Sequence, residues 1–296
     1  MREVPIILEI PESEKTLFDR FIISQRAQHI RSSQKIVDEI FLSRPDLQNS
    51  ITETKTVSEI IKMLRSDVWN EFLKDEVNFN AEIMKHLHQV LQTPKELLEA
   101  LIENNITGML QEDLVESVKE LCGEYAGRIF PYLYALSLSN TQSRRSRAGK
   151  TFEAIIYKLY NLLDYKFDSQ NKVGRKIFSD VGLGKKVDSI LPGIEQFNKR
   201  RNKTIIGTMK TSLRERWQEV AEEIERTKIP EIHLLTVDED ISPGKASEMS
   251  KHNIVIVTYS WVADSTKLND AKNIVSFEEY FFEEIPNILE YWRKND

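Results

Sequence analysis

Across its C-terminal half the chain alternates between short β-rich runs and helical segments, and this alternation restricts the fold more than any other feature. The first run ends at a Pro-Gly turn, and the later runs are apolar along their whole length. The predicted strands are residues 186–191, 204–209, 232–237 and 254–259, and the predicted helices are residues 213–224, a short polar segment from Pro243, and residues 277–292. Strands that alternate with helices pack as a sheet covered by helices, so we predict an α/β fold.

The N-terminal part has helical periodicity instead. Residues 13–41 carry apolar side chains at helical spacing, and helix-start signals occur at Thr56 and at Thr93-Pro94. Asn104, Asn105 and Gly108 interrupt the pattern, which resumes over 111–138 and, after a polar connection at 139–147, over 152–163. We therefore expect a mainly helical part, residues 1–108, followed by a core, residues 109–296.

Charge is distributed unevenly along the chain. The formal net charge is -6, which alone disfavours a nucleic-acid partner, yet residues 185–216 hold nine Lys or Arg against three acidic residues. A second basic cluster without acidic residues comprises Arg144, Arg145, Arg147 and Lys150. A basic strip on an acidic body indicates a protein that binds a polyanion in one cleft.

The remaining composition is that of a soluble globular protein. One cysteine, Cys122, excludes an internal disulfide and a thiolate metal cluster, and we expect it to be a small buried side chain. The first ten residues lack the apolar run of a signal peptide, and no segment has the ~18 apolar residues of a membrane span. We therefore expect a cytoplasmic protein.

Two residues on neighbouring predicted strands suggest a hydrolytic site. Asp188 lies late in one strand and Lys210 late in the next, so one sheet edge can bring them together. Phosphodiester hydrolysis needs carboxylates that hold Mg²⁺ and a group that serves the attacking water. An aspartate and a lysine so placed form the core of the PD-(D/E)xK nuclease pattern. The usual acid two residues before the lysine is replaced by Thr208, so Glu223 on the following helix is our choice for the second carboxylate. Glu219 and Glu222 remain alternatives.

Three segments resemble a known family, the type II restriction endonucleases of the EcoRII, SsoII and PspGI group, which are related to the CCGG-cutting enzymes. The segment SRRSRAGKTFE (143–153) is similar to the family's Arg-rich lead into a helix. KVDSILP (186–192) resembles its catalytic-aspartate strand, and TMKTSLRERW (208–217) resembles its lysine strand and recognition helix. The spacings agree as well, with 22 residues from Asp188 to Lys210 and 13 from Lys210 to Glu223.

The resemblance implies roles for these residues. Asp188 and Glu223 would hold Mg²⁺, Lys210 would serve the attacking water, and Glu153 would be an accessory acid. The recognition residues would be Arg214, Glu215 and Arg216. Arginine donates two hydrogen bonds to guanine and glutamate accepts one from cytosine, so such a cluster suits a CC/GG half-site. The resemblance further implies a PD-(D/E)xK core with a central mixed sheet, and a homodimer on double-stranded DNA that cuts before CC and leaves 5′ overhangs. CCNGG is the best guess for the site, with CCWGG and CCGG still open.

A further hypothesis concerns Arg65 and Trp69. They lie four residues apart on one predicted helix and therefore share a face, as in family members that flip bases into an Arg–Trp pocket. A core position for Trp69 is the alternative. For the whole chain, a repair-type or sequence-nonspecific nuclease of the same fold and a non-catalytic DNA-binding protein are the rival interpretations.

Overall fold

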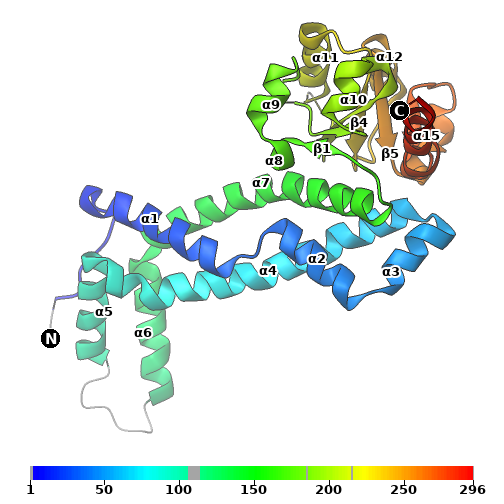
Figure 1. Cartoon of the computed structure of the whole chain (residues 1–296). Helices are drawn as coiled ribbons and strands as arrows, with labels where there is room; N and C mark the ends of the chain where they lie inside the picture. Colours follow the sequence, from blue (N-terminus) through cyan, green and yellow to red (C-terminus); the bar gives the residue numbers. More distant parts are fainter. Residues whose placement is uncertain (1–2, 106–113, 185, 215, 296) are drawn as a thin grey trace. The chain divides into compact units, whose positions relative to one another are not determined.

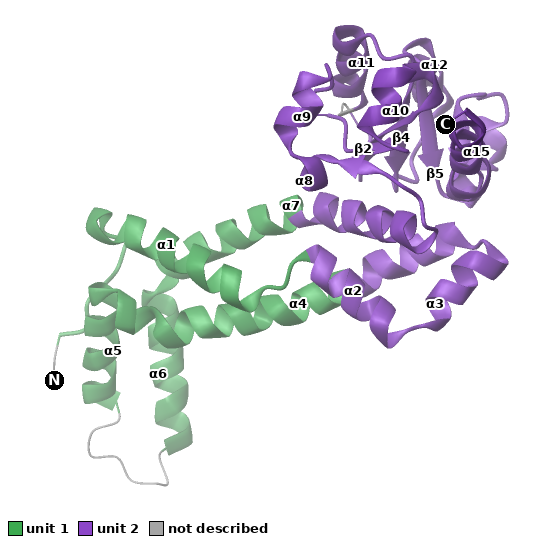
Figure 2. Cartoon of the chain, in the orientation of Figure 1, with its two compact units in different colours: residues 1–32, 69–146 green, residues 33–68, 147–296 purple. Residues whose placement is uncertain are grey.

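The computed structural model describes residues 3–105, 114–184, 186–214 and 216–295 (Figure 1). They pack as two compact units, each built from separate stretches of the chain: residues 1–32 with 69–146, and residues 33–68 with 147–296 (Figure 2). Helices α4 (Val57–Val90) and α7 (Phe130–Leu162) contribute residues to both units. Each of these two helices therefore runs through both units.

The second unit contains a six-stranded mixed sheet in the order β1-β2-β3-β4-β5-β6. β1 and β3 pair with β2 in antiparallel fashion, and β3 to β6 run parallel to one another. The strands are β1 (Asp168–Ser169), β2 (Ser189–Leu191), β3 (Ile205–Lys210), β4 (Ile232–Thr236), β5 (Ile254–Thr258) and β6 (Ile274–Ser276). Every residue of β4 is buried, as is typical of a parallel strand in the middle of a covered sheet.

Short helices connect these strands, and α11 and α12 are the crossovers between the parallel ones. α12 begins at Pro243, and the Ser242 hydroxyl caps it by accepting the Lys245 N–H at 3.3 Å. The helical elements of this unit besides α4 and α7 are α2 (Ser33–Ser43), α3 (Asp46–Asn49), η1 (Ser50–Thr54), α8 (Gln170–Val173), α9 (Arg175–Asp180), α10 (Ile194–Lys199), η3 (Arg201–Lys203), α11 (Arg216–Thr227), α12 (Pro243–Lys251), α13 (Ser260–Ala263), η4 (Thr266–Leu268), α14 (Phe277–Glu279), η5 (Tyr280–Glu284) and α15 (Ile285–Asn295). The predicted fold class is thus observed.

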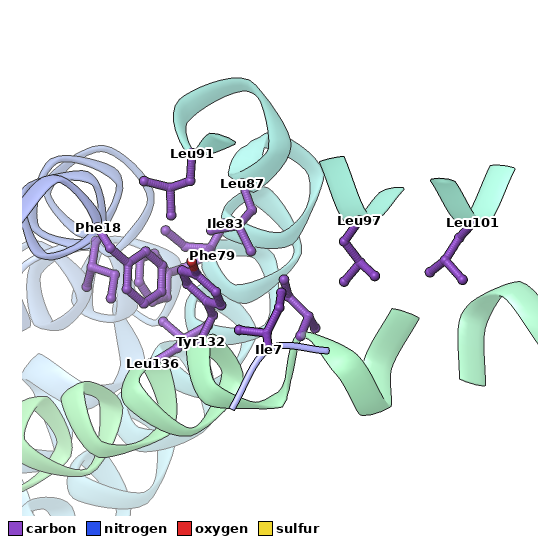
Figure 3. Close-up of a cluster of buried hydrophobic side chains, with 12 residues drawn as sticks. Ile7, Phe18, Phe79, Ile83, Leu87, Leu91, Leu97, Leu101, Tyr132 and Leu136 are labelled. Carbon is purple, nitrogen blue, oxygen red and sulfur yellow. The ribbon is translucent and has the colours of Figure 1, made fainter. Parts of the chain in front are cut away.

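The first unit is helical. It comprises α1 (Glu12–His29), α5 (Gln92–Asn105), α6 (Leu114–Arg128) and parts of α4 and α7 around an apolar core (Figure 3). The Phe18 and Tyr132 rings meet edge to face with centroids 5.3 Å apart in this core. The buried Glu14 carboxylate accepts hydrogen bonds from the Thr93 N–H at 2.9 Å and the Tyr132 hydroxyl at 2.5 Å, so it ties α1 to α5 and α7.

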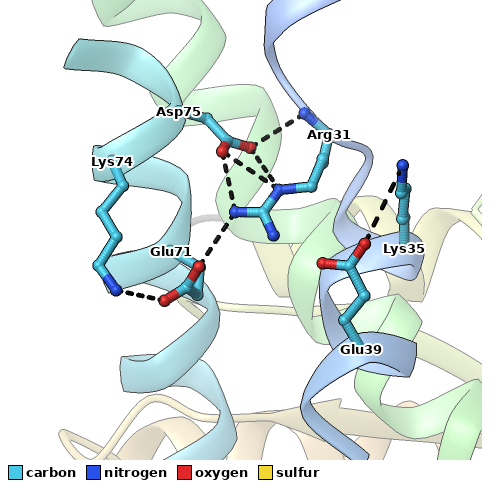
Figure 4. A network of polar contacts seen from close by, with 6 residues as sticks. All are labelled: Arg31, Lys35, Glu39, Glu71, Lys74 and Asp75. Atoms are coloured by element: carbon cyan, nitrogen blue, oxygen red, sulfur yellow. Dashed lines mark hydrogen bonds and ion pairs between the residues drawn. The ribbon is translucent and has the colours of Figure 1, made fainter. Parts of the chain in front are cut away.

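An ion-pair network holds the end of α1 to α4 (Figure 4). The Arg31 guanidinium donates to both oxygens of Asp75, and its Nη2 lies 3.0 Å from Glu71 Oε2. The Arg31 backbone N–H donates to Asp75 as well, at 3.0 Å. Hydrogen bonds from Lys74 and then Arg31 lower the pKa of Glu71. Because the Asp75 side chain is largely buried, the network fixes Arg31, just after the end of α1, against α4.

Several local expectations need correction. Residues 139–147 do not connect two helices, because α7 runs through them without a break. Their polar side chains lie mostly on solvent-facing positions, and the stretch contains no proline that would stop a helix. Residues 13–41 are helical as expected and form α1 and α2, and Cys122 is exposed instead of buried. Of the helices in the described part of the chain, none combines the length and apolar character needed to cross a membrane.

Candidate active site

Asp188 and Lys210 meet where β2 begins and β3 ends. Asp188 immediately precedes β2 rather than lying late in it, and antiparallel pairing places this end of β2 beside the end of β3. The Asp188 N–H donates to the Gly207 carbonyl at 2.8 Å, and the Met209 N–H donates to Asp188 Oδ2 at 2.6 Å. The same Oδ2 lies 3.9 Å from Lys210 Nζ. Backbone hydrogen bonds on both sides therefore fix the carboxylate that faces the lysine.

Thr208 links the pair. This fully buried residue takes the position where the PD-(D/E)xK pattern usually has an acid. Its hydroxyl accepts a hydrogen bond from Lys210 Nζ at 3.2 Å and lies 3.4 Å from Asp188 Oδ2, to which it can donate. Thr208 thus bridges the lysine and the aspartate without adding a negative charge.

Glu153 is the second carboxylate near this pair. It lies on α7, and burial together with the charge of Asp188 raises the pKa of Glu153 to about 7, while Lys210 and Lys150 act in the opposite direction. Burial likewise raises the pKa of Asp188, against the influence of Lys210 and the Met209 N–H. Two partly buried carboxylates that resist ionisation together can both ionise when a divalent cation binds between them, because its positive charge compensates theirs. Their oxygens are also ligands that such a cation prefers.

Tyr157 was not singled out in the sequence. It lies four residues after Glu153 and so on the same face of α7, and its hydroxyl donates to the backbone carbonyl of Asp188 at 2.9 Å. This bond anchors α7 to the start of β2. The spacing from Glu153 was the signal that could have identified it.

Glu223 lies on α11, and its carboxylate is buried. It pairs with Arg226, with Oε1 2.6 Å from Nη2, and it packs so closely on Gly184 that a Cβ there would lie 2.0 Å from Oε1. No contact between Glu223 and Asp188 occurs among the residues that the structure describes. Within those same residues, no three or more His, Cys, Asp or Glu side chains gather as a metal site.

The two alternatives to Glu223 differ from it in burial. Glu219 forms an ion pair with Lys186, two residues before Asp188, and is partly exposed. Glu222 is exposed. Of the three glutamates, Glu223 alone is buried on the side of α11 that faces the loop before Asp188.

The structure describes only part of the predicted recognition cluster. Arg214 is exposed just before α11, whereas Glu215 lies outside the described residues, as does the side chain of Arg216. The cluster follows Lys210 by only a few residues, so recognition and cleavage groups are close in the chain.

The Arg-rich segment lies on α7. Arg145 and Lys150 are exposed and Arg147 is partly buried. Arg144 is engaged within the first unit, where Nε donates to Glu76 Oε1 at 3.0 Å and the guanidinium lies 5.9 Å from the centre of the Trp69 ring. Arg145 and Lys150 thus have the exposure expected of phosphate-binding side chains, and Arg144 has a protein partner.

Arg65 and Trp69 both lie on α4, as expected, and their surroundings differ. Arg65 Nη1 donates to the Tyr259 hydroxyl at 3.1 Å in the second unit. Trp69, in the first unit, is 37% exposed and packs against Phe72 with ring centroids 5.3 Å apart. Trp69 is therefore neither a core residue nor a fully free aromatic face.

The six-stranded mixed sheet has an aspartate just before β2 and a lysine at the end of β3. This combination defines a restriction-endonuclease-like fold. The family model "EcoRII C terminal" matches residues 112–281, more than half of the chain. The type II restriction enzyme SsoII of Shigella sonnei is 32% identical over 263 residues, which is 88% of this chain and 79% of that protein. The chain therefore belongs to the EcoRII C-terminal family and is a type II restriction endonuclease.

Solved structures agree with this assignment. Metal-depleted Ecl18kI in complex with uncleaved DNA is 30% identical with a TM-score of 0.69, and the match covers 93% of this chain and 84% of that one. A second Ecl18kI complex, with modified DNA, gives 28% and 0.70 at the same coverage. The PspGI–substrate DNA complex shares the fold, with 21% identity and a TM-score of 0.59 over 89% of this chain and 95% of that one. The predicted family and fold are confirmed.

Proposed function

We propose that this restriction endonuclease is a homodimer that cuts double-stranded DNA at a palindrome with CC and GG half-sites, best CCNGG, in the presence of Mg²⁺. Cleavage would occur before CC and leave 5′ overhangs. The observation that carries the proposal is the arrangement of Asp188, Lys210 and Glu153, in which two carboxylates and an ammonium group lie near one another where β2 begins and β3 ends. The related Ecl18kI and PspGI structures are described as DNA complexes, and Ecl18kI as metal-depleted.

The residues present suit a divalent cation. Asp188 would hold it, with Glu153 as the neighbouring acid and Glu223 as the second ligand that the sequence spacing suggests. A bound Mg²⁺ would offset the negative charge that develops on the scissile phosphate. Because burial and the charge of Asp188 raise the pKa of Glu153, added positive charge favours ionisation of both carboxylates.

The chain's own groups prepare the site for hydrolysis. Lys210 Nζ is held by the Thr208 hydroxyl and by the Met209 carbonyl at 3.3 Å, so its ammonium group is oriented before DNA arrives. From that position it can donate a hydrogen bond to the attacking water and stabilise negative charge on the phosphate. The Met209 N–H keeps Asp188 from turning away.

DNA recognition is assigned to three groups of residues. Arg214 and Arg216 would each donate to guanine O6 and N7, and Glu215 would accept from cytosine N4. The phosphate contacts would come from α7, through Arg144, Arg145, Arg147 and Lys150. Arg65 and the partly exposed Trp69 would receive a flipped central base, which would let the enzyme ignore the identity of that base.

The division of labour and the assembly follow from these assignments. Residues 1–108 would contribute DNA contacts, and residues 109–296 would form the catalytic core. A two-fold homodimer would place one recognition cluster on each half of the palindrome and one catalytic site on each strand. With Cys122 as its one cysteine, the protein suits a reducing compartment, and we propose that it acts in the cytoplasm.

The test is digestion of a sequenced plasmid by the purified protein, with Mg²⁺ and with EDTA, followed by run-off sequencing of the ends. We expect discrete Mg²⁺-dependent cuts before CC in every site, and the sequences across the cuts give the central and flanking bases. The Lys210→Ala protein is the matched control for a contaminating nuclease. Cuts at a site without CC and GG half-sites, or cutting that persists in EDTA, would contradict the proposal.

A further inference from the structure

The segment between Lys210 and α11 is held by a residue from another strand. Residues 211–214 form neither helix nor strand. Within them, the Leu213 N–H donates to Asp238 Oδ2 at 2.7 Å. Asp238 lies just after β4, the parallel neighbour of β3, and the register pairs Lys210 with Thr236. The Asp238 carboxylate, just after β4, therefore binds the segment that follows β3.

Asp238 is itself firmly oriented. Its backbone N–H donates to the buried Thr236 hydroxyl at 3.1 Å, and its Oδ1 accepts the Asp240 N–H at 3.1 Å. This Asx-type turn leaves Oδ2 directed at Leu213. A carboxylate accepts a shorter and stronger hydrogen bond from a backbone N–H than a neutral group does. The hydrogen bond from the Leu213 N–H to Asp238 therefore starts from a carboxylate whose orientation the turn already fixes.

Leu213 is fixed from its other side as well, because its side chain is completely buried. The next residue, Arg214, is exposed and begins the recognition cluster. Two residues, Thr211 and Ser212, separate Leu213 from Lys210. Lys210 and Arg214, which lie on either side of residues 211–213, both have proposed functions. Residues 211–213 themselves have no helical or strand hydrogen bonding.

We propose that Asp238 is a positioning residue, which holds the Lys210–Arg214 segment so that base recognition and cleavage stay in register. The inference rests on the proposed base-reading role of Arg214. Without the Asp238 acceptor, the catalytic lysine would keep its place in β3, and the recognition residues would lose their fixed starting point. Discrimination between correct and altered sites would fall more than the catalytic rate at the correct site.

The test compares Asp238→Ala, Asp238→Asn and Asp240→Ala. The value of kcat/KM is measured on duplexes that contain the mapped site or the site with one base pair changed. We expect Asp238→Ala to reduce the ratio of the two values by about tenfold, the effect of losing one hydrogen bond to a charged group. Asp238→Asn has one acceptor oxygen for the two backbone N–H groups of Leu213 and Asp240, so it should restore only part of the ratio. Asp240 contributes only its backbone N–H to the turn, so Asp240→Ala should match the wild type.

Two further measurements keep the outcome decisive. Where Asp238→Ala fails to fold by circular dichroism and thermal melting, Asp238→Glu, which keeps the charge and displaces the carboxylate by one methylene, takes its place with the same expected loss of discrimination. A wild-type ratio in a folded Asp238→Ala or Asp238→Glu protein overturns the inference. Arg214→Ala separates the two proposals: if Arg214→Ala retains discrimination, base reading by Arg214 is wrong, and if Arg214→Ala alone loses discrimination, only the role of Asp238 is wrong.

Discussion

Oδ2 of Asp188 lies 3.9 Å from Nζ of Lys210, and the same oxygen accepts the Met209 N–H from the strand that carries the lysine. The separation of the two groups is therefore set by the register of β2 against β3, in which Ser189 faces Gly207. A shift of one residue would turn every side chain of the strand to the opposite face of the sheet. The β2–β3 register thus fixes the position of Asp188 relative to Lys210.

Lys210→Ala should abolish cleavage while leaving DNA binding intact. The ammonium group donates to the Thr208 hydroxyl and lies 3.9 Å from Asp188, and its loss should slow single-turnover cleavage on the order of 10²- to 10⁴-fold, as for other positioned proton-transfer groups. Affinity is measured by gel shift in Ca²⁺ or EDTA. Lys294→Ala, on the exposed face of the terminal helix, is the matched control and should cut at the wild-type rate. An equal loss of affinity and of rate would contradict a catalytic role.

Glu153 should make the metal-free enzyme less stable as the pH rises. The folded-state pKa is raised from 4.5 to about 7, so the folded protein holds this proton where the unfolded chain has lost it. The resulting stabilisation is complete below pH 4.5 and is lost as the pH rises through 7. At one pKa unit per 1.36 kcal/mol, the loss is at most about 3 kcal/mol.

Glu153→Gln removes this dependence and is the measurement that checks it. In EDTA, urea unfolding from pH 4.5 to pH 8 should show a difference between Glu153→Gln and wild type that grows with pH in favour of the variant. The same proton must leave before a cation binds, so wild-type cleavage should also rise with pH near 7. A stability difference independent of pH would show that Glu153 is ionised throughout.

Gly184 should be indispensable for the position of Glu223. A Cβ at residue 184 would lie 2.0 Å from Glu223 Oε1, so the buried carboxylate would have to move. Gly184→Ala should therefore lower cleavage at least about tenfold, in the same direction as Glu223→Gln. Gly244→Ala is the control, because a Cβ there meets nothing within 4 Å. Full activity of Gly184→Ala would separate Glu223 from the catalytic site.

The Arg31–Asp75 pair should contribute to stability rather than to catalysis. Breaking such a largely buried pair leaves an uncompensated carboxylate, so Arg31→Met should lower the free energy of unfolding by about 3 kcal/mol. The exposed Lys119–Glu116 pair provides the contrast, and Lys119→Met should change stability little. Both variants should keep the wild-type kcat under conditions where they are folded.

Sequence patterns predicted much of the sheet and the core of the site. The apolar runs that became β3, β4 and β5 are long enough for their periodicity and composition to be decisive, and Pro243 marks the start of α12. Lys210 was singled out at the end of the run that became β3, and Asp188 in the run that contains β2. By contrast, β1 and β6 contain two and three residues, too few for any pattern, and they are strands only because β2 and β5 provide hydrogen-bonding edges.

The features that the sequence did not predict depend on contacts between distant segments. The polar stretch 139–147 resembles a loop, and it is helical because neighbouring helices support it through contacts such as Asn140 Nδ2 to Asn80 Oδ1 at 2.9 Å. Tyr157 and Asp238 act through backbone groups 31 and 25 residues away. A backbone acceptor or donor leaves no trace in side-chain identity, so no motif indicated Asp238, and only the four-residue spacing from Glu153 pointed to Tyr157.

Because α7 is a continuous helix, it limits which insertions and deletions the protein can tolerate in evolution. Arg147, Lys150, Glu153 and Tyr157 lie on one continuous helix, and each inserted or deleted residue would rotate everything beyond it by about 100°. Replacement of individual side chains along this stretch leaves the others where they are. A change in its length would turn Glu153 and Tyr157 away from Asp188 together, so we expect relatives to vary here in composition and to keep the number of residues constant.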